Sequence, residues 1–442
     1  MRSSTARHLV APMYLFACII LGGNAQSIWQ NMILQLAGLA IIAWAAAASP
    51  GALPRSAKAL LIIAMAFVGV VALQAIPLPL SVFADGVRAR IASDYRLLGS
   101  TTQTAPVSLS PFGSLAAFLA VVPPLAIFCA MARQEAYRVS WLIAALLAGI
   151  AALITLSVLQ IAGGNGSRSY LTAGDWMARP SHMVDLLIVA VPFLFIVASN
   201  PSGRNFRRYA VLGIVGTAVG GLLVAGFFFP NAIAAYALVI PVLAASALTL
   251  TFPGSRSRRW LILLVAISAA GSLAALSLTP LAGNVAGHEV SGSKQSRGQI
   301  LATTGRAIAD LAPLGSGLGS FVRVYPLYAR PGAVSPDPIV HAYNDYAEVA
   351  LELGLPGIAL TAAFLIWWAM AVWPVWRSAD GVSFGQAASI ASAAVLAHSL
   401  FDFPLRTPAV SVAFAMCLGL LVARPTRAPR KDLRPTRHVV IA

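Results

Sequence analysis

One stretch of the sequence, residues 294–352, concentrates side chains that can do chemistry. It includes one lysine, four arginines, one histidine and a group of closely spaced carboxylates: Lys294, Arg297, Arg306, Arg323, Arg330, His341, Asp345, Glu348 and Glu352. Guanidinium groups bind phosphate and carboxylate groups through paired hydrogen bonds, and histidine exchanges a proton near neutral pH. The combination indicates an anion-binding site with His341 as the candidate proton acceptor.

The spacing of the acidic residues predicts how they are presented. In a helix from His341 to Leu353, the four polar residues His341, Asp345, Glu348 and Glu352 form one narrow stripe. The opposite side is apolar, with Tyr346, Val349, Ala350 and Leu353. The pattern predicts an amphipathic helix lying against a membrane. The alternative interpretation is that the stripe is only a water-exposed face.

A second helix and a glycine-rich turn precede this stripe. Residues 296–311 have a helical pattern, with Arg306 and Asp310 four residues apart on one face. Pro313 then ends the helix, and the glycines that follow are Gly315, Gly317 and Gly319. Such a turn lets a ligand approach the backbone, although a flexible connector has the same composition. Because no nucleotide-binding fold surrounds the turn, a P-loop or Rossmann interpretation is rejected.

The elements that must position these groups are membrane helices. Of the 442 residues, 59% are hydrophobic and 10% are charged, and the mean hydropathy is +0.81, whereas soluble domains are about 25% charged. A membrane-crossing helix needs about 20 mostly apolar residues. We predict an all-α polytopic membrane protein with twelve spans, at 9–24, 31–48, 59–76, 113–131, 140–161, 184–198, 209–228, 232–252, 260–279, 356–375, 386–401 and 408–423.

The distribution of charge predicts the orientation. With the N-terminus inside, nineteen of the 30 Lys and Arg residues fall on the cytoplasmic side, where basic loops are retained, and most acidic residues fall outside. This predicts cytoplasmic termini and four parts. Residues 1–280 hold nine helices and a shorter periplasmic loop at 77–112, 281–355 form the periplasmic loop that carries the site, 356–423 hold three helices, and 424–442 form a basic tail. The net charge of +16 reflects this topology and attraction to anionic lipids, so nucleic acid is excluded as a partner.

Neither a disulfide nor a metal site is expected. Cys18, Cys129 and Cys417 all fall inside predicted spans. The outer acidic residues are scattered, and apart from the helical stripe none has the spacing of metal ligands. We therefore expect no metal and no other cofactor.

Three segments resemble the O-antigen ligase and Wzy-type polysaccharide polymerase superfamily of bacterial inner membranes. They are Arg297 with the glycine-rich turn 313–321, His341-Ala-Tyr-Asn-Asp-Tyr-Ala-Glu348 with its continuation to Gly357, and His398-Ser-Leu-Phe-Asp-Phe-Pro-Leu-Arg406. Two positions depart from the family pattern. Tyr343 stands where ligases commonly place a histidine directly before the asparagine, and Phe229–Ile233 replaces a Ser-Arg-Gly-like element.

The resemblance implies glycan transfer from an undecaprenyl-pyrophosphate carrier on the periplasmic face, in a helical fold similar to the C-type glycosyltransferases. The expected reaction is polymerisation of surface or exopolysaccharide repeat units onto a glycan or lipid-linked acceptor, with other polysaccharide assembly proteins as partners. We expect Arg297 to stabilise the leaving pyrophosphate and His341 to act as general base, with Glu348 in reserve and Tyr343 as the alternative. The residues expected to bind substrate are Arg306, Arg323, Arg330, Asn344, Asp345, Gly317, Gly319, Asp402 and Arg406, and a structural ion pair is the alternative for the last two.

Three other functions stay open. A ligase would transfer the glycan to the lipid A core. A transporter would need charged or broken elements near the bilayer midplane, or internal repeats, but Asp185 is the only ionisable residue predicted well within a span, and it lies near the outer end. A relative without catalytic activity would only recruit assembly partners.

Overall fold

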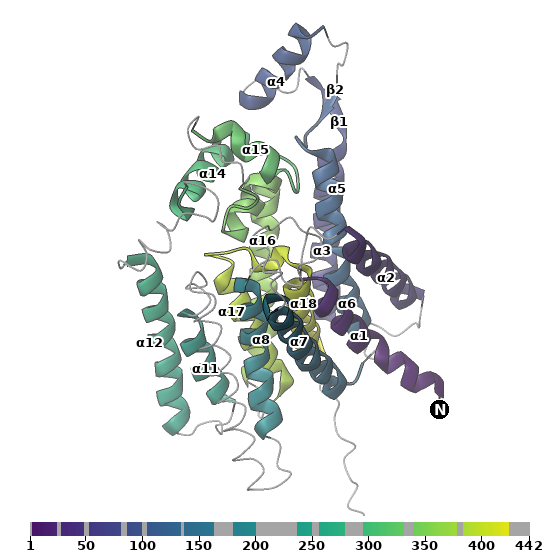
Figure 1. The fold of residues 1–442 in the computed structure, drawn as a ribbon, viewed down its shortest axis with the longest axis vertical. Coiled ribbons are helices and arrows are strands. Elements are labelled where there is room, and N and C mark those ends of the chain that lie inside the picture. Colours follow the sequence, from purple (N-terminus) through teal and green to yellow (C-terminus); the bar gives the residue numbers. More distant parts are fainter. Residues whose placement is uncertain are drawn as a thin grey trace, which may run out of the picture.

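The fold is mostly helical (Figure 1). A computed structural model describes residues 2–23, 28–47, 53–80, 86–99, 104–133, 137–162, 180–199, 237–249, 256–278, 295–330, 339–377 and 383–423. Two three-residue strands, β1 (Pro77–Pro79) and β2 (Thr104–Pro106), pair antiparallel with Pro77 opposite Pro106. The described residues therefore have the helical architecture that the sequence predicts.

The bundle is formed by helices that overlap the predicted spans. They are α1 (Arg2–Leu21), α2 (Ile28–Ala47), α3 (Arg55–Ala75), α5 (Pro111–Ala120), α6 (Val122–Ala132), α7 (Val139–Ala162), α8 (Pro180–Ser199), α11 (Val239–Leu248), α12 (Arg256–Leu278), α16 (Asp345–Arg377), α17 (Phe384–His398) and α18 (Pro408–Val422). Together, α5 and α6 cover the single span predicted at 113–131. The span predicted at 209–228 lies outside the described residues.

Five described helical segments are long and apolar enough to cross a membrane: Ile28–Ala47, Arg55–Ala75, Pro111–Ala132, Val139–Leu156 and Asp345–Arg377. Four further apolar helices are shorter. Large apolar side chains such as Ile62, Met65, Met370 and Trp373 point outward and are more than half exposed, as lipid-facing residues would be. The chain has the helices of a membrane protein, and the number of twelve crossings stays a prediction.

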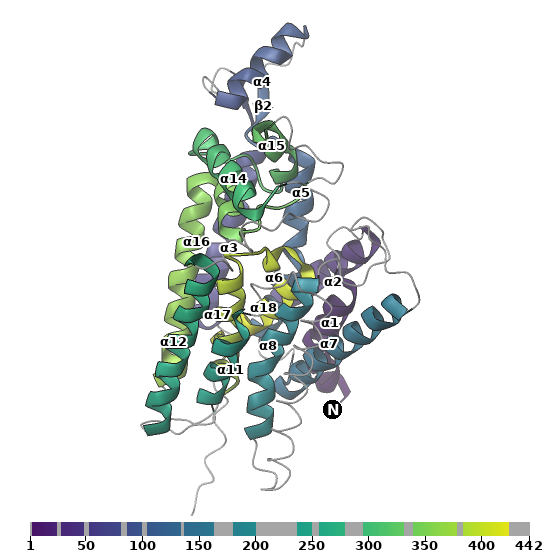
Figure 2. The ribbon, with the colours of Figure 1, turned by 60° about the vertical axis from the view of Figure 1, so that its left-hand side comes forward.

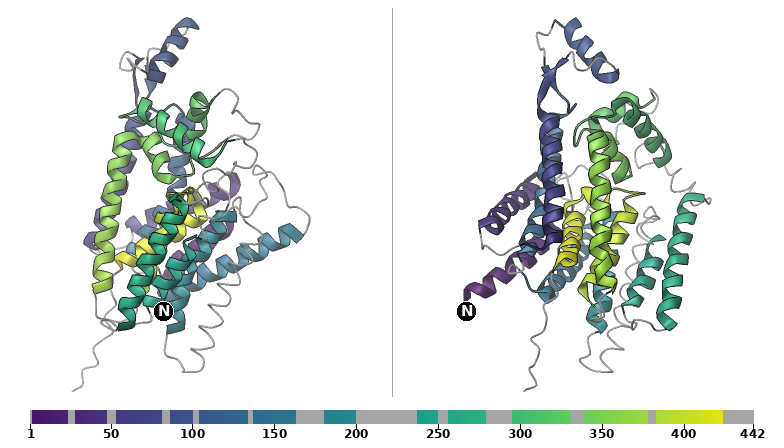
Figure 3. Two further views of the ribbon diagram at one scale, coloured as in Figure 1. Left: turned by 90° about the vertical axis from the view of Figure 1, so that its left-hand side faces the viewer. Right: turned by 180° about the vertical axis from the view of Figure 1, so that it is seen from behind.

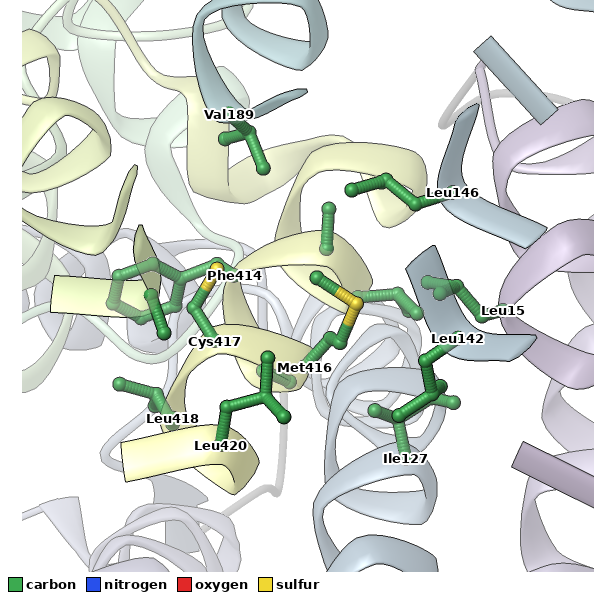
Figure 4. Close-up of a cluster of buried hydrophobic side chains, with 14 of the residues drawn as sticks. Leu15, Ile127, Leu142, Leu146, Val189, Phe414, Met416, Cys417, Leu418 and Leu420 are labelled. Atoms are coloured by element: carbon green, nitrogen blue, oxygen red, sulfur yellow. The ribbon is translucent and has the colours of Figure 1, made fainter. Parts of the chain in front are cut away.

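The centre of the bundle is α18, which is apolar on all sides. All 15 of its residues are buried, and it contacts α1, α6, α8 and α17. Side chains such as Met416 and Leu420 pack among Leu15, Ile127 and Val189 of the surrounding helices (Figure 4). The long α16 runs beside α3 and α17, and is drawn in light green in Figure 3. This packing places the two ends of the α17–α18 connection next to the start of α16.

A smaller helical head lies at one end of the bundle (Figure 2). We define the head as β1, α4 (Gly86–Leu97), β2, α14 (Arg297–Leu311), α15 (Phe321–Tyr328) and residues 345–353 of α16. Its small apolar core includes Ile300, Phe321 and Val324, and Tyr343 and Phe403 from adjoining segments complete it. The first residues of α1 lie at the opposite end of the molecule (Figure 1).

Local sequence explains where the helices of the head begin and end. Ser296 and Gln299 form a reciprocal capping box at the start of α14, so the helix predicted over 296–311 is confirmed. The helix predicted from His341 begins instead at Asp345, because the Asn344 side chain accepts a hydrogen bond from Ala347 N at 2.9 Å and so caps it. Gly354 has φ 64° and separates 345–353 from the rest of α16.

The orientation of this arrangement can be tested with reporter fusions. We expect phosphatase activity from a fusion after Ser335 and none from a fusion after Arg437, because the basic loops and tail are retained inside. A green fluorescent protein at the same two positions serves as the reciprocal control. Phosphatase activity after Arg437, or its absence after Ser335, would contradict the predicted topology.

Candidate active site

The polar stripe of α16 faces the interior of the protein. Asp345, Glu348 and Glu352 are 5%, 1% and 0% exposed. The interpretation of a water-exposed face is therefore wrong, whereas contact of this helix with the membrane stays a prediction. The reason is a cation from a distant segment, Arg406, which the local pattern of 341–353 does not contain.

Arg406 belongs to a single helical turn, η3 (Pro404–Arg406), and reaches all three carboxylates. Its Nη1 lies 3.0 Å from Glu352 Oε2 and 3.5 Å from Glu348 Oε1, and its Nε lies 3.7 Å from Asp345 Oδ1. Burial alone would lower the pKa of the Arg406 guanidinium, but the three carboxylates raise it above its ordinary value. Arg406 therefore carries a permanent charge that offsets buried negative charge.

Further donors hold each carboxylate in place. Ser399 Oγ donates to Asp345 Oδ2 at 2.9 Å, Ala342 N donates to Glu348 Oε2 at 3.0 Å, and Phe321 N donates to Glu352 Oε1 at 3.4 Å. Buried carboxylates are stable only when such bonds satisfy their oxygens. Through these hydrogen bonds the cluster joins α15, α16 and the α17–α18 connection.

His341 is attached to this cluster through Glu348. Its Nδ1 lies 2.9 Å from Glu348 Oε1, and its ring lies 4.0 Å from that of Phe403. The side chain is 23% exposed, so it is not sealed from solvent as Glu348 is. When Nδ1–H donates to the carboxylate, Nε2 is the nitrogen that accepts a proton.

Arg297 and Tyr343 lie beside this pair. The guanidinium of Arg297 stands over the Tyr343 ring at 5.1 Å, and its Nη1 donates to Phe401 O at 3.4 Å. Tyr343 has φ 56°, which is unfavourable for a non-glycine residue, and its ring packs edge-on against Phe403. Backbone strain of this kind is held by surrounding structure and is common at functional sites. The Tyr343 ring therefore supports the guanidinium of Arg297.

The structure separates the predicted site residues into two groups. One group meets at this centre: Arg297, His341, Tyr343, Asn344, Asp345, Glu348 and Arg406. Of these, Asn344 also donates to Leu400 O at 2.9 Å and ties α16 to the α17–α18 connection. The other group, Arg306, Arg323 and Arg330, is exposed on the outer side of the head, and no described side-chain contact joins it to the centre.

The glycine-rich turn packs against the protein itself. Ser316 N donates to Leu351 O and Gly317 N to Glu352 O, both at 2.8 Å, and Gln74 Nε2 donates to the carbonyls of Leu314 and Glu352 at 2.9 Å. The interpretation of a flexible connector is therefore wrong. Close approach of the chain's own backbone accounts for these glycines, and the role of Gly317 and Gly319 in substrate binding stays a prediction.

Gly317→Ala should destabilise the protein by about 1–3 kcal/mol, because φ is +102° and a Cβ atom would lie 2.6 Å from Ser108 Cα and closer still to its side chain. Thermal unfolding in detergent, followed by size-exclusion chromatography, measures this change. Gly305→Ala is the matched control, since nothing lies within 4 Å of its Cβ position inside α14. Equal melting temperatures of Gly317→Ala and wild type would contradict the packing.

A second buried pair lies near Arg297, and the sequence interpretation assigned it no role. His398 Nδ1 is 2.6 Å from Asp185 Oδ1, and the two side chains are 1% and 2% exposed. The sequence did single out both residues. His398 stands in the third motif, and Asp185 is the ionisable residue predicted within a span. Asp402 does not join Arg406 in the described ion pairs, and its Oδ1 instead accepts from Phe403 N at 3.0 Å.

Chelation should leave the activity of this site intact, because the Arg406 guanidinium occupies the space between the three carboxylates that a cation would need. Among the described residues, no group of three or more His, Cys, Asp or Glu residues has the geometry of a metal site. Purified protein would be assayed with EDTA and again after addition of Mg²⁺ or Mn²⁺. Loss of activity with EDTA that Mg²⁺ restores would contradict this expectation.

Comparison with known families adds one finding. Residues 222–362 match a family model described as O-antigen ligase. The matched segment contains α14, α15, Arg297, His341 and the three carboxylates of α16, whereas Arg406 lies beyond it. No curated protein matches the chain.

Proposed function

We propose that this chain, whose residues 222–362 match a family model described as O-antigen ligase, transfers a glycan from undecaprenyl pyrophosphate to a glycan acceptor. The proposed reaction is polymerisation of repeat units of a surface or exported polysaccharide. It takes place at the periplasmic face of the bacterial inner membrane, where the head would meet both lipid-linked substrates. The proposal includes no nucleotide sugar and no metal.

The observation that carries this proposal is the pairing of His341 with Glu348 beside Arg297. A glycosyl transfer to a hydroxyl group needs a proton acceptor and a group that stabilises the departing anion. His341, held through Nδ1 by Glu348, supplies the first, and Arg297 supplies the second. Both residues lie at the edge of the buried carboxylate cluster, which fixes Glu348 through Arg406.

In the proposed step, the acceptor hydroxyl oxygen bonds to the anomeric carbon of the donor sugar while the bond from that carbon to the pyrophosphate oxygen breaks. The electron pair of the broken bond leaves with undecaprenyl pyrophosphate. The hydroxyl proton moves to His341 Nε2, and the resulting imidazolium is stabilised by the Glu348 carboxylate on Nδ1. Glu348 keeps its own charge throughout.

Arg297 is suited to the leaving group because a guanidinium binds a diphosphate through two hydrogen bonds, whereas an ammonium acts as a point charge. The guanidinium stacks on the Tyr343 ring and donates to the Phe401 carbonyl, and these two contacts limit the directions in which it can point. Negative charge grows on the pyrophosphate as the bond breaks, so this contact strengthens in the transition state.

The polysaccharide of a deletion strain would distinguish a polymerase from a ligase. We expect loss of long polysaccharide chains with single repeat units still attached to their acceptor, which indicates a polymerase. Loss of all attached glycan would assign the protein as a ligase that acts on lipid A core. Unchanged chain length and unchanged attachment would contradict both, and complementation with the wild-type chain is the control.

A further inference from the structure

Two buried histidine contacts join α8 to both ends of the α17–α18 connection, residues 399–407. At one end, Asp185 of α8 faces His398, the last residue of α17, with Oδ1 and Nδ1 2.6 Å apart. At the other end, a hydrogen bond joins Nδ1 of His182 to the Thr407 hydroxyl. All four side chains are buried, and α8 packs against α17 and α18 (Figure 2). Because residues three apart share one side of a helix, a single face of α8 holds both ends of the connection.

The connection carries the backbone acceptor of Arg297. Phe401 O accepts a hydrogen bond from Arg297 Nη1 at 3.4 Å. Phe401 N and Asp402 N donate to His398 O at 2.8 Å and 3.0 Å, so the chain continues from His398 through a tight hydrogen-bonded turn. The carbonyl that receives Arg297 is therefore tied to the backbone of His398, whose side chain meets Asp185.

Stability alone does not account for the Asp185–His398 pair. Its two side chains are 2% and 1% exposed, and in the described part of the chain Asp185 Oδ2 and His398 Nε2 have no hydrogen-bond partner. A buried pair of ionisable groups offsets its desolvation only when its remaining polar atoms are also satisfied, and apolar side chains of similar size are often equally stable or more so. The position that the pair imposes on the connection is the better explanation for it.

We propose that Asp185 and His398 are positioning residues for glycan transfer, which fix the α17–α18 connection and through it the direction of the Arg297 guanidinium. The inference rests on the proposed function, in which Arg297 stabilises the leaving pyrophosphate. Both residues act at one remove, because their buried side chains do not face solvent. A shift of about 1 Å in a group that must meet the transition state can cost about 10²-fold in rate.

The test replaces the pair by apolar side chains, so that no charge stays buried. In the double variant Asp185→Leu with His398→Leu, we expect a melting temperature equal to that of the wild type or higher. We expect kcat for transfer to fall about tenfold or more with KM for the donor nearly unchanged, since an interaction made in the transition state is lost. Asp185→Asn should keep most of the activity, because its amide oxygen still accepts from His398. Ser389→Ala is the matched control, since it removes another buried contact of α17, the hydrogen bond from Trp376 at 2.9 Å, away from the connection.

A second measurement follows Arg297 without transfer. Full-length protein in phosphatidylcholine nanodiscs would be titrated with undecaprenyl pyrophosphate, the leaving group with its charge fully developed. We expect Arg297→Ala and the double leucine variant each to weaken this binding by about tenfold or more, and Ser389→Ala to leave it unchanged. In an Arg297→Ala background, the same leucine replacements should change binding by less than about threefold, because the group that they misplace is already absent.

Three results would overturn the inference. They are wild-type kcat and binding in the double leucine variant, a melting temperature of that variant well below the wild type, which would assign the pair to stability, or fold-changes that simply multiply when Arg297→Ala is added. The proposed function fails separately. Undecaprenyl pyrophosphate binding that depends on the pair, in a wild type that transfers no glycan, would refute the proposed function alone, and transfer that the double leucine variant retains in full would refute this inference alone.

Discussion

Arg297→Ala should lower kcat/KM for glycan transfer by about 10³-fold, as removal of a transition-state anion donor does in other enzymes. His341→Ala should cost less, about 10²-fold, at the low end of the range for general bases. The pyrophosphate must gain charge as its bond to the sugar breaks. By contrast, a hydroxyl that attacks an oxocarbenium-like carbon can release its proton late, so missing base catalysis is partly tolerated.

Arg297→Lys should restore only part of the lost activity, because a lysine cannot form the two-pronged contact or stack on Tyr343 in the same way. The measurement is a reconstituted assay with lipid-linked donor, after matching the expression and melting temperature of each variant. Tyr343→Phe is the control, since it keeps the ring under Arg297 and removes only the hydroxyl. Near-normal activity of Arg297→Ala would rule out its proposed role. An inactive Tyr343→Phe beside an active His341→Ala would move proton transfer to Tyr343.

Arg406→Ala should be the most destabilising single change in the candidate site. It removes the cation that Asp345, Glu348 and Glu352 share, and loss of one partner from a buried ion pair costs about 3–5 kcal/mol. We expect little folded protein in detergent and no transfer. Fluorescence-detected size-exclusion chromatography and thermal unfolding measure the loss of folded protein. Arg377→Ala is the control and should behave like wild type, because Arg377 is exposed.

A rescue experiment tests whether Arg406 stabilises the protein as the counter-charge of the buried carboxylates. In an Arg406→Gln background, the neutral replacements Asp345→Asn, Glu348→Gln and Glu352→Gln should recover much of the melting temperature, since no uncompensated charge stays buried. Transfer should remain low, because a glutamine at 348 no longer stabilises the His341 imidazolium. A stable and fully folded Arg406→Ala variant would contradict the arrangement of the cluster.

Much of the fold follows from the sequence, because its determinants are local. Runs of apolar residues predict the helices, and the Ser296 and Gln299 capping box starts α14 where the pattern predicts it. The candidate site residues can also be identified from the nearby sequence, since Arg297, His341 and Glu348 stand out by their chemistry and by the motifs around them.

The sequence by itself thus determined that this is a helical membrane protein, and it indicated the segment for which we propose the chemistry. Only the tertiary structure decided which way the polar stripe of α16 faces, because Arg406, more than 50 residues away, turns it inward. The same holds for the glycine-rich turn, whose glycines meet backbone from α16 and from the segment after β2. Burial of a charge depends on where its partner lies in space, and spacing along one helix cannot supply that distance.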